Sequence, residues 1–266
     1  MRSALFLLVL ATPLAAQDNV LFPRFSLVGG SSASDFETNA RIDPETSAEE
    51  GTLVSFENDL GLDDSSQLER FSVQWRPFAR HELAATYFSA PRSGREQIDR
   101  EIVFRNETYR AQALVTTQWD LDYASLTYTY WLRRGERDGF GLTLGAATLA
   151  LDASVTAERE DESLTVTQEA NTDVPVALVG LQGRVALTQH VLGEASVATL
   201  PRVTIEDYTG SALTASARIE YRPVRWLGIG AAYNYFRLDV DVEQLDLRGA
   251  LDMTIRGPEA FVRLAF

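Results

Sequence analysis

The chain has 266 residues, of which 45% are hydrophobic, and 38 acidic residues against 24 basic ones give it a formal net charge of −14. A chain this acidic repels nucleic acid, so a nucleic-acid partner is not expected. Cysteine is absent, which excludes a disulfide framework and a thiolate metal site.

The first sixteen residues predict a secretory signal peptide. Arg2 gives a positive start, and residues 4–11 form an apolar run that is too short to span a bilayer. Small residues up to Ala16 suit a cleavage site, which can shift by one or two positions. A buried N-terminal helix is the alternative. The predicted domains are a signal peptide, 1–16, and one all-β domain, 17–266.

From Arg24 onward, apolar residues recur at every second position, which is the pattern of β-strands and not of helices. Short turns separate the segments, two of them built on Arg-Pro at 76–77 and 222–223. The pattern predicts about ten strands, with eight or twelve left open. Their predicted ranges are 24–42, 66–75, 81–88, 112–132, 139–157, 164–187, 191–208, 211–221, 227–242 and 246–266.

One face of each predicted strand carries large apolar residues, and the other carries small or charged ones. In Leu227–Tyr235, for example, the large residues alternate with glycine, alanine and asparagine. Together with the export signal, this predicts an antiparallel transmembrane β-barrel whose apolar face touches lipid and whose other face lines the lumen. Aromatic residues near the turns fit the girdles of such a barrel. They are Trp75, Tyr128, Tyr130, Trp131, Tyr221 and Trp226.

After Tyr235 the apolar set changes parity, to Phe236, Leu238, Val240 and Val242. We interpret this change as a β-bulge, because one extra residue would return these side chains to the lipid face.

The long connections are acidic, whereas the turns at the opposite end are short. This asymmetry is typical of outer-membrane barrels, so we expect the long loops to be extracellular. Segments 51–56 and 101–104 are either extra strands or hairpins folded within these loops. The acidic stretches are 43–50, 57–64, 158–162 and 239–243.

The chain ends on an alternating strand with Val262, Leu264 and the terminal Phe266 on one face. This resembles the C-terminal assembly signal of Gram-negative outer-membrane β-barrels. The block at 51–62, with the Arg-Pro-Phe turn that follows, is similar to small barrels of the OmpA/OmpW-like or porin-like class that have no assigned activity. The resemblance implies insertion by the barrel assembly machinery and contact with outer-membrane lipids, including lipopolysaccharide.

Charged residues on the lumen-facing set gather near the tight-turn end. Arg184 and Glu194 are equidistant from the turn at residue 189 and should oppose one another across a hairpin. The set can be read as a selectivity constriction or as a structural network. We favour the network, because a barrel of about ten strands is close to the size that side chains fill. Its members are Arg70, Glu82, Arg184, Glu194, Arg218, Glu220, Glu259 and Arg263.

No catalytic residue, cofactor or metal site is predicted. The two histidines, His81 and His190, lie beside tight turns and have no serine partner in their spacing. The glycines of 139–145 lie within a strand and have no helix after them, so they do not form a nucleotide loop. The densest acidic cluster fits no EF-hand spacing; it consists of Glu57, Asp59, Asp63 and Asp64.

These features predict an outer-membrane barrel with a charged, partly plugged lumen, which acts as a structural element or passes small solutes. A barrel that binds ligands or surfaces through its acidic loops is the alternative. An outer-membrane enzyme is the third hypothesis, and we expect no enzymatic activity.

Overall fold

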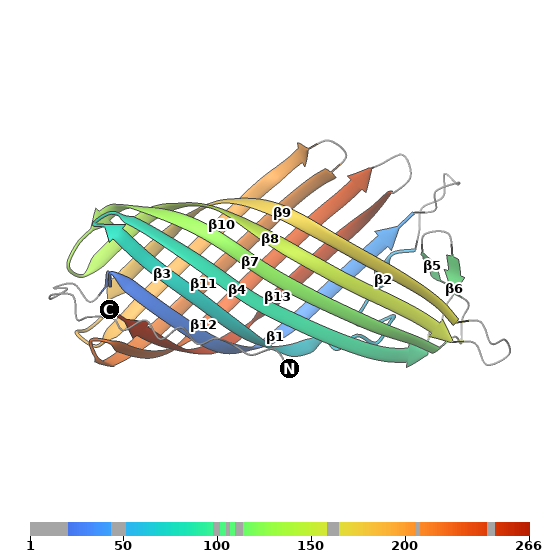
Figure 1. The fold of residues 1–266 in the computed structure, drawn as a ribbon, viewed down its shortest axis with the longest axis horizontal. Coiled ribbons are helices and arrows are strands. Elements are labelled where there is room, and N and C mark those ends of the chain that lie inside the picture. The colour runs from blue at the N-terminus through green and yellow to red at the C-terminus, as the bar shows by residue number, and fades with distance from the viewer. Residues whose placement is uncertain are drawn as a thin grey trace, which may run out of the picture.

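The computed structural model describes residues 21–43, 52–97, 102–104, 107–109, 114–158, 165–205, 208–243 and 248–266. The signal-peptide segment 1–16 lies outside these residues. Ten antiparallel strands are hydrogen-bonded in chain order into a closed ring, in which β13 returns to pair with β1 (Figure 1). The predicted barrel of about ten antiparallel strands is confirmed.

The ring strands are long. They are β1 (Phe25–Ile42), β3 (Ser65–Phe78), β4 (His81–Gln97), β7 (Leu114–Arg134), β8 (Asp138–Glu158), β9 (Thr165–Ala186), β10 (Val191–Ile205), β11 (Tyr208–Val224), β12 (Leu227–Glu243) and β13 (Arg248–Ala265). The segments left open in the sequence form short strands outside the ring: β2 (Val54–Ser55) pairs with β1, and β5 (Ile102–Phe104) forms a hairpin with β6 (Glu107–Tyr109).

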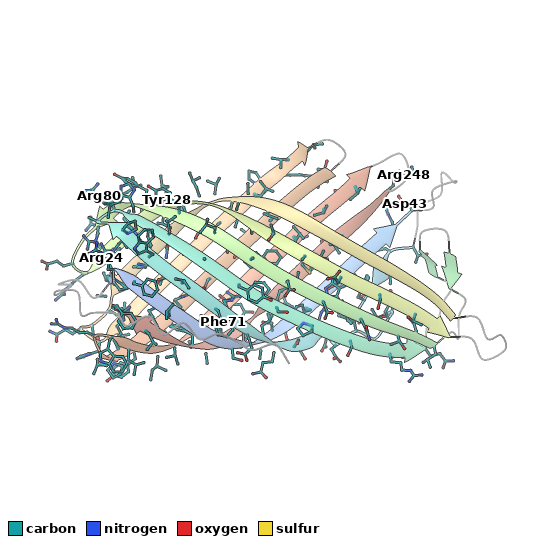
Figure 2. The ribbon with its side chains drawn as sticks, viewed as in Figure 1. Arg24, Asp43, Phe71, Arg80, Tyr128 and Arg248 are labelled. Carbon is teal, nitrogen blue, oxygen red and sulfur yellow. The ribbon has the colours of Figure 1, made fainter. Side chains whose placement is uncertain are left out.

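The Arg-Pro motifs mark irregular pairing where strands approach the tight turns. The register shifts between Trp75 and Phe78 and again between Tyr221 and Val224. Pro77 and Pro223 lie inside these shifts, because proline has no N–H to donate to a ladder. Figure 2 places Arg24, Arg80 and Tyr128 toward this end of the barrel, with Asp43 and Arg248 at the other.

An outward-facing apolar band surrounds the half of the barrel next to the tight turns. Leu142 and Tyr233 are 45% and 52% exposed on its surface, whereas Arg184 on the inner face is buried. The long strands are sufficient to cross the hydrocarbon core, for which a tilted strand needs about 9–11 residues. The apolar-out, polar-in assignment made from the sequence therefore describes this half. The described residues contain no helix that is long and apolar enough to span a membrane.

Beyond the band, the same wall carries its apolar side chains inward. In β7, Leu126 points outward and is 59% exposed, whereas Leu121 points inward and is 1% exposed. In β12, Tyr233 faces outward and Leu238 lies in the interior. The bulge predicted after Tyr235 is wrong, because β12 pairs there with both neighbours without a register shift. The chain keeps its pleat, and the polarity of its two faces inverts.

This inverted half of the barrel encloses an apolar core, and outward acidic side chains such as Asp122 and Asp152 face away from it. Phe36, Trp119 and Leu149 belong to the core and are at most 4% exposed. The molecule therefore joins a lipid-facing barrel with a polar lumen to a barrel that is built like a soluble one.

Leu149→Ala and Leu142→Ala compare the two environments on one strand. Leu149 lies in the dry core, so truncation loses both the transfer free energy and a cavity term, about 2–4 kcal/mol in total. Leu142 lies on the band, where lipid fills the vacated space and only the smaller transfer term remains. Urea titration of the folded barrel in lipid vesicles should therefore rank Leu149→Ala as clearly less stable. Equal losses would contradict the inversion.

Residues 54–62 complete the wall between β1 and β4. The ladder between β1 and β3 ends at Asp35, and beyond it Val54 pairs with Ala40 of β1. At the other side, Leu62 bridges to Gly94 of β4. A side chain on Gly94 would overlap the backbone at position 61, so the close approach requires glycine.

The aromatic residues near the turns are not all on the lipid face. Trp75, Tyr221 and Trp226 are 50–54% exposed there. Trp131 is 0% exposed and points into the lumen, where its Nε1 donates to Glu82 at 3.3 Å. The prediction that Trp131 belongs to a girdle is therefore wrong.

Candidate functional site: a charged lumen floor beneath an internal chamber

Six of the charged residues on the lumen face near the tight turns form one connected network, which we call the lumen floor: Glu82, Arg184, Glu194, Arg218, Glu220 and Arg263. The structure places all eight candidate residues on inward positions of their strands. Arg184 and Glu194 are directly opposed in the β9–β10 ladder. The floor links five strands, since its side chains come from β4, β9, β10, β11 and β13.

Arg184 is the centre of the lumen floor. Its two terminal nitrogens donate to the two carboxylate oxygens of Glu82 at 2.6 and 2.9 Å, and its Nε donates to Glu194 at 3.1 Å. Its guanidinium also lies 4.6 Å from the Trp131 ring centroid. Such a forked geometry suits arginine, since it satisfies several donors of the buried cation at once.

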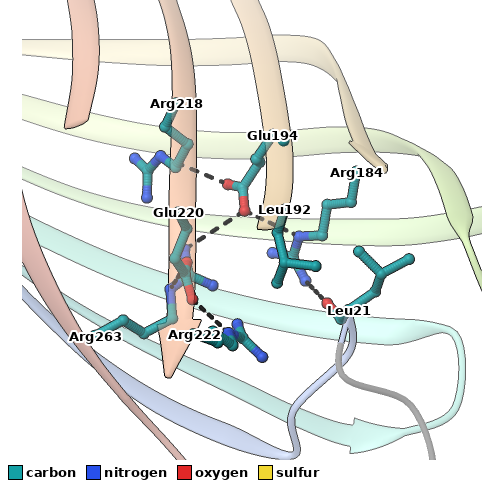
Figure 3. A pocket seen from close by; sticks show the side chains of 9 residues that line it. Leu21, Arg184, Leu192, Glu194, Arg218, Glu220, Arg222 and Arg263 are labelled. Atoms are coloured by element: carbon teal, nitrogen blue, oxygen red, sulfur yellow. Dashed lines mark hydrogen bonds and ion pairs between the residues drawn. The ribbon is translucent and has the colours of Figure 1, made fainter. Parts of the chain in front are cut away.

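Glu194 and Glu220 connect Arg184 to the far side of the floor (Figure 3). Glu194 also lies 3.5 Å from Arg263 and 4.0 Å from Arg218, so one carboxylate serves three guanidinium groups. Arg263 reaches Glu220 at 3.0 Å. A cavity of about 10 Å³ remains between these side chains, which is large enough for one water molecule.

Arg70 and Glu259 pair higher in the lumen, at 3.5 Å. Glu259 also accepts from Asn234 Nδ2 at 2.7 Å. Position 30 of β1 is glycine, and a Cβ there would lie 2.5 Å from the Glu259 carboxylate, so the small residue makes room for the acid.

Sequence reasoning missed Arg76 and Arg222, which were assigned to the turns. Both point inward and are at most 8% exposed. Arg222 pairs with Glu220, and Arg76 donates to the backbone carbonyls of Phe22 and Pro23. Strand parity places both on the same face as Gln74 and Glu220, so extending the strands through the Arg-Pro motifs would have found them.

The segment Leu21–Pro23 closes the lumen below the floor. Phe22 is fully buried and packs edge-to-face on Trp131 with ring centroids 4.8 Å apart. Arg184 donates to the Leu21 carbonyl at 3.4 Å. Gly139 of β8 lies against the Phe22 ring, and a Cβ there would overlap it. We call Leu21–Pro23 the N-terminal plug.

A chamber of about 170 Å³ lies above the floor. Hydroxyl groups from several strands line its walls, among them Thr86, Thr127 and Ser216. Above it, Phe88 and Tyr123 stack with ring centroids 4.7 Å apart and begin the apolar core of the outer half. Arg70, Arg218 and Glu82 also line the chamber, so its wall combines hydroxyl, charged and aromatic side chains.

A second buried ion pair lies within the apolar core. Arg92 donates to Glu57 at 2.7 Å and to the Thr38 hydroxyl at 2.9 Å. Its guanidinium lies 4.3 Å from the Phe36 ring centroid. The carboxylate of Glu57, expected in a solvated acidic loop, therefore fixes residues 54–62 to the wall.

The other members of that acidic cluster do not converge on a cation. Asp59 accepts from the Ser55 backbone N–H at 2.9 Å, while Asp63 and Asp64 are exposed. Among the described side chains, no group of three or more potential metal ligands comes together. The histidines lie outside the floor: His81 contacts Tyr128 Oη at 2.7 Å, and His190 contacts the Arg222 carbonyl at 2.9 Å.

The outer wall beyond the apolar band carries charge ladders. Arg237 lies 3.0 Å from Asp239 and 2.8 Å from Asp252, and the two carboxylates are directly opposed across β12 and β13. The hydrogen bond from Arg237 lowers the pKa of Asp239, whereas partial burial and the neighbouring Asp239 raise the pKa of Asp252. This surface is acidic and ordered.

Comparison with solved structures finds outer-membrane β-barrels. The outer membrane protease OmpT from Escherichia coli matches with a TM-score of 0.59 and 9% identity, over 91% of this chain and 96% of that one. The translocator domain of the autotransporter NalP from Neisseria meningitidis has a TM-score of 0.43 and 10% identity, over 91% and 88%. The outer membrane protein OprG from Pseudomonas aeruginosa has a TM-score of 0.40 and 10% identity, over 94% and 100%.

No protein-family model and no curated protein matches the sequence. At 9% identity the OmpT match carries information on the fold alone, and it agrees with the apolar band and the closed ring of strands. The chain therefore has the fold of the Gram-negative outer-membrane β-barrels.

Proposed function

We propose that the protein is a closed barrel of the outer membrane, which does not conduct at rest and serves as a rigid scaffold for its extracellular end. The observation that carries this proposal is the burial of lumen side chains at two levels. In an open channel, water would reach these side chains. Trp131 and Arg263 at the floor, and Leu149 and Met253 above the chamber, are at most 1% exposed.

The charges of the floor support a structural network over a selectivity filter. A filter needs charged groups that line a water-filled path. Here the carboxylates of Glu82, Glu194 and Glu220 are held by guanidinium groups at 2.6–3.1 Å. Such pairs hold the strands of the ring in place, and they leave no mobile counter-ion path.

Planar-bilayer recording tests the proposal. The purified barrel should insert without discrete conductance steps in molar salt, while a porin recorded under the same conditions serves as the positive control. Regular steps from the wild-type protein would refute the closed-barrel function and restore small-solute passage.

Surface binding is the second candidate, and the acidic outer wall favours it. Asp122, Asp152 and Asp239 project from strands beyond the apolar band, where they would face lipopolysaccharide phosphates. Divalent cations shared between these carboxylates and the phosphates would then bind the two together. Vesicles containing lipopolysaccharide should stabilise the wild-type barrel in Mg²⁺ more than in EDTA. Replacing the three aspartates by asparagine should remove that difference if the candidate is correct.

We further propose that the barrel assembly machinery recognises the terminal strand, where Val262 and Phe266 are 46% and 51% exposed on the lipid face. No catalytic role is proposed, since the histidine contacts described above supply no nucleophile. The long connections are proposed to be extracellular, because the tight turns, the N-terminal plug and the C-terminus share the opposite end (Figure 1).

A further inference from the structure

The chamber above the lumen floor is built from groups of contrasting chemistry. Its volume of about 170 Å³ is close to that of a cavity that admits one benzene-sized molecule. Inward side chains from opposite sides of the ring line it, so its shape is fixed by the barrel and not by a loop.

Two arginines with weak ion pairs line the chamber. Arg218 has one carboxylate partner among the described residues, Glu194, at 4.0 Å, and that carboxylate is engaged more closely by Arg184 and Arg263. Arg70 lies 3.5 Å from Glu259, and its Nε makes no hydrogen bond. The side chains of Arg218 and Arg70 retain 15% and 21% exposure, and both line the chamber.

These two guanidinium groups are therefore only partly neutralised where they face the chamber. Figure 3 shows Glu194 between Arg218 and Arg184, with one carboxylate oxygen toward each arginine and the shorter contact to Arg184. A buried cation whose charge is only partly neutralised favours the binding of an anion next to it.

The side of the chamber next to Arg70 is aromatic: the Arg70 guanidinium lies 5.2 Å from the Phe88 ring centroid, and the two residues are paired across β3 and β4. The Phe88 and Tyr123 rings stack at an interplanar angle of 16°, and Phe236 meets Tyr123 with centroids 6.0 Å apart. Leu178 and Ile255 extend this apolar side. A ligand that carried charge at every end would leave one charge against these rings without a partner.

Two buried polar atoms of the chamber wall have no hydrogen-bond partner among the described residues. Ser216 Oγ and Asn234 Oδ1 are buried and make no hydrogen bond within the described part of the chain, and both residues line the chamber. Buried polar groups in folded proteins are nearly always satisfied by protein or by ordered water, so these two atoms are available to water or to a polar ligand in the chamber.

We propose that the chamber binds one small monocarboxylate with an apolar body, of the size of benzoate. Its carboxylate lies at Arg70 and Arg218, and its ring or short hydrocarbon chain lies against Phe88, Tyr123 and Phe236. The ligand neutralises the charge of the two arginines, and it uses the aromatic side that a simple inorganic anion leaves untouched.

Three probes test separately whether the carboxylate and the aromatic ring of the ligand are recognised: benzoate, acetate and benzyl alcohol. The barrel is refolded from urea in the presence of each probe at millimolar concentration, so that a closed lumen does not delay entry. Because a ligand that binds only the folded state raises its stability, benzoate should raise the unfolding midpoint in a concentration-dependent manner. Acetate lacks the ring and benzyl alcohol lacks the charge, so both should have little effect.

Arg218→Gln is the decisive variant, because Glu194 keeps Arg184 and Arg263 as partners when Arg218 is replaced. It should lower the apparent benzoate affinity by about tenfold or more, which is the usual loss for one charge-assisted hydrogen bond. Arg70→Gln should act similarly, since Glu259 retains Asn234. Arg202→Gln is the matched control, because it removes the same charge from the exposed outer wall.

A wild-type midpoint that does not respond to benzoate would overturn the proposal. The proposal would also be overturned if benzoate raised the midpoint of Arg218→Gln as much as that of the wild type, because benzoate would then act at another place. An equal effect of acetate would show a simple anion site and refute the role of the aromatic side. If Arg218→Gln does not refold, the comparison rests on Arg70→Gln with the same criteria.

Discussion

Replacing Arg184 with alanine should destabilise the barrel by about 3–5 kcal/mol, because it leaves two buried carboxylates without their main cation. Arg184 is 4% exposed and makes three hydrogen bonds to Glu82 and Glu194. The measurement is the urea midpoint in lipid vesicles, followed by tryptophan fluorescence. Conductance should not appear, since the apolar core above the chamber still closes the lumen.

Two further variants show that the loss comes from uncompensated charge. Arg184→Met with Glu82→Gln removes both charges, so the double variant should lose less than the sum of its single variants. Arg133→Ala breaks an exposed pair with Asp138 at the tight turn and should leave the midpoint unchanged. A small loss for Arg184→Ala, equal to that of Arg133→Ala, would show that the floor does not stabilise the barrel.

Gly139→Ala should dislodge the N-terminal plug and open the lower end of the lumen. The added methyl group would overlap the Phe22 ring, and the other nearby side chain, Trp131, is itself packed against the floor. A single cysteine in place of Ser216 reports on the chamber without background, because the chain has no cysteine of its own. Labelling by a small methanethiosulfonate reagent should become on the order of tenfold faster or more in Gly139→Ala, since the rate follows the open population.

The controls for this experiment lie on neighbouring positions. Gly183→Ala places a methyl group where the nearest atom is 3.8 Å away, so labelling should stay slow. Phe22→Ala combined with Gly139→Ala removes the overlap. The lower end should then also be open, so that labelling is fast, but without the strain that Gly139→Ala alone places on Trp131. Unchanged labelling in Gly139→Ala would show that the plug does not limit access to the chamber.

Period-two alternation predicted much of the fold, because a strand places successive side chains on opposite faces wherever it lies. The alternation also predicted that Arg184 and Glu194 oppose each other across a hairpin, since hairpin register follows from the length of the turn. The same rule failed after Tyr235. Alternation alone does not say which face meets water, and a change of parity has the same appearance whether a residue is inserted or the surroundings change from lipid to water.

Two other parts of the site needed three-dimensional information. Leu21 and Phe22 precede the first strand, and nothing in their spacing indicates that they fold back beneath Trp131. Glu57 lies in an acidic stretch, and only the gap in the wall between β1 and β4 brings it to Arg92. Both contacts join residues far apart along the chain, so no local pattern predicts them.

The inversion of the wall also bears on how the barrel enters a bilayer. A barrel that closed before insertion would have to carry the carboxylates of Asp122, Asp152 and Asp239 through hydrocarbon, at about 2.5–3.5 kcal/mol for each ionised group at the membrane centre. In the orientation proposed above, this half of the molecule crosses the bilayer first, and we expect it to cross before the β1–β13 seam is sealed. Unassisted insertion into preformed vesicles should be slow at neutral pH, and thinner or defect-rich bilayers should accelerate it.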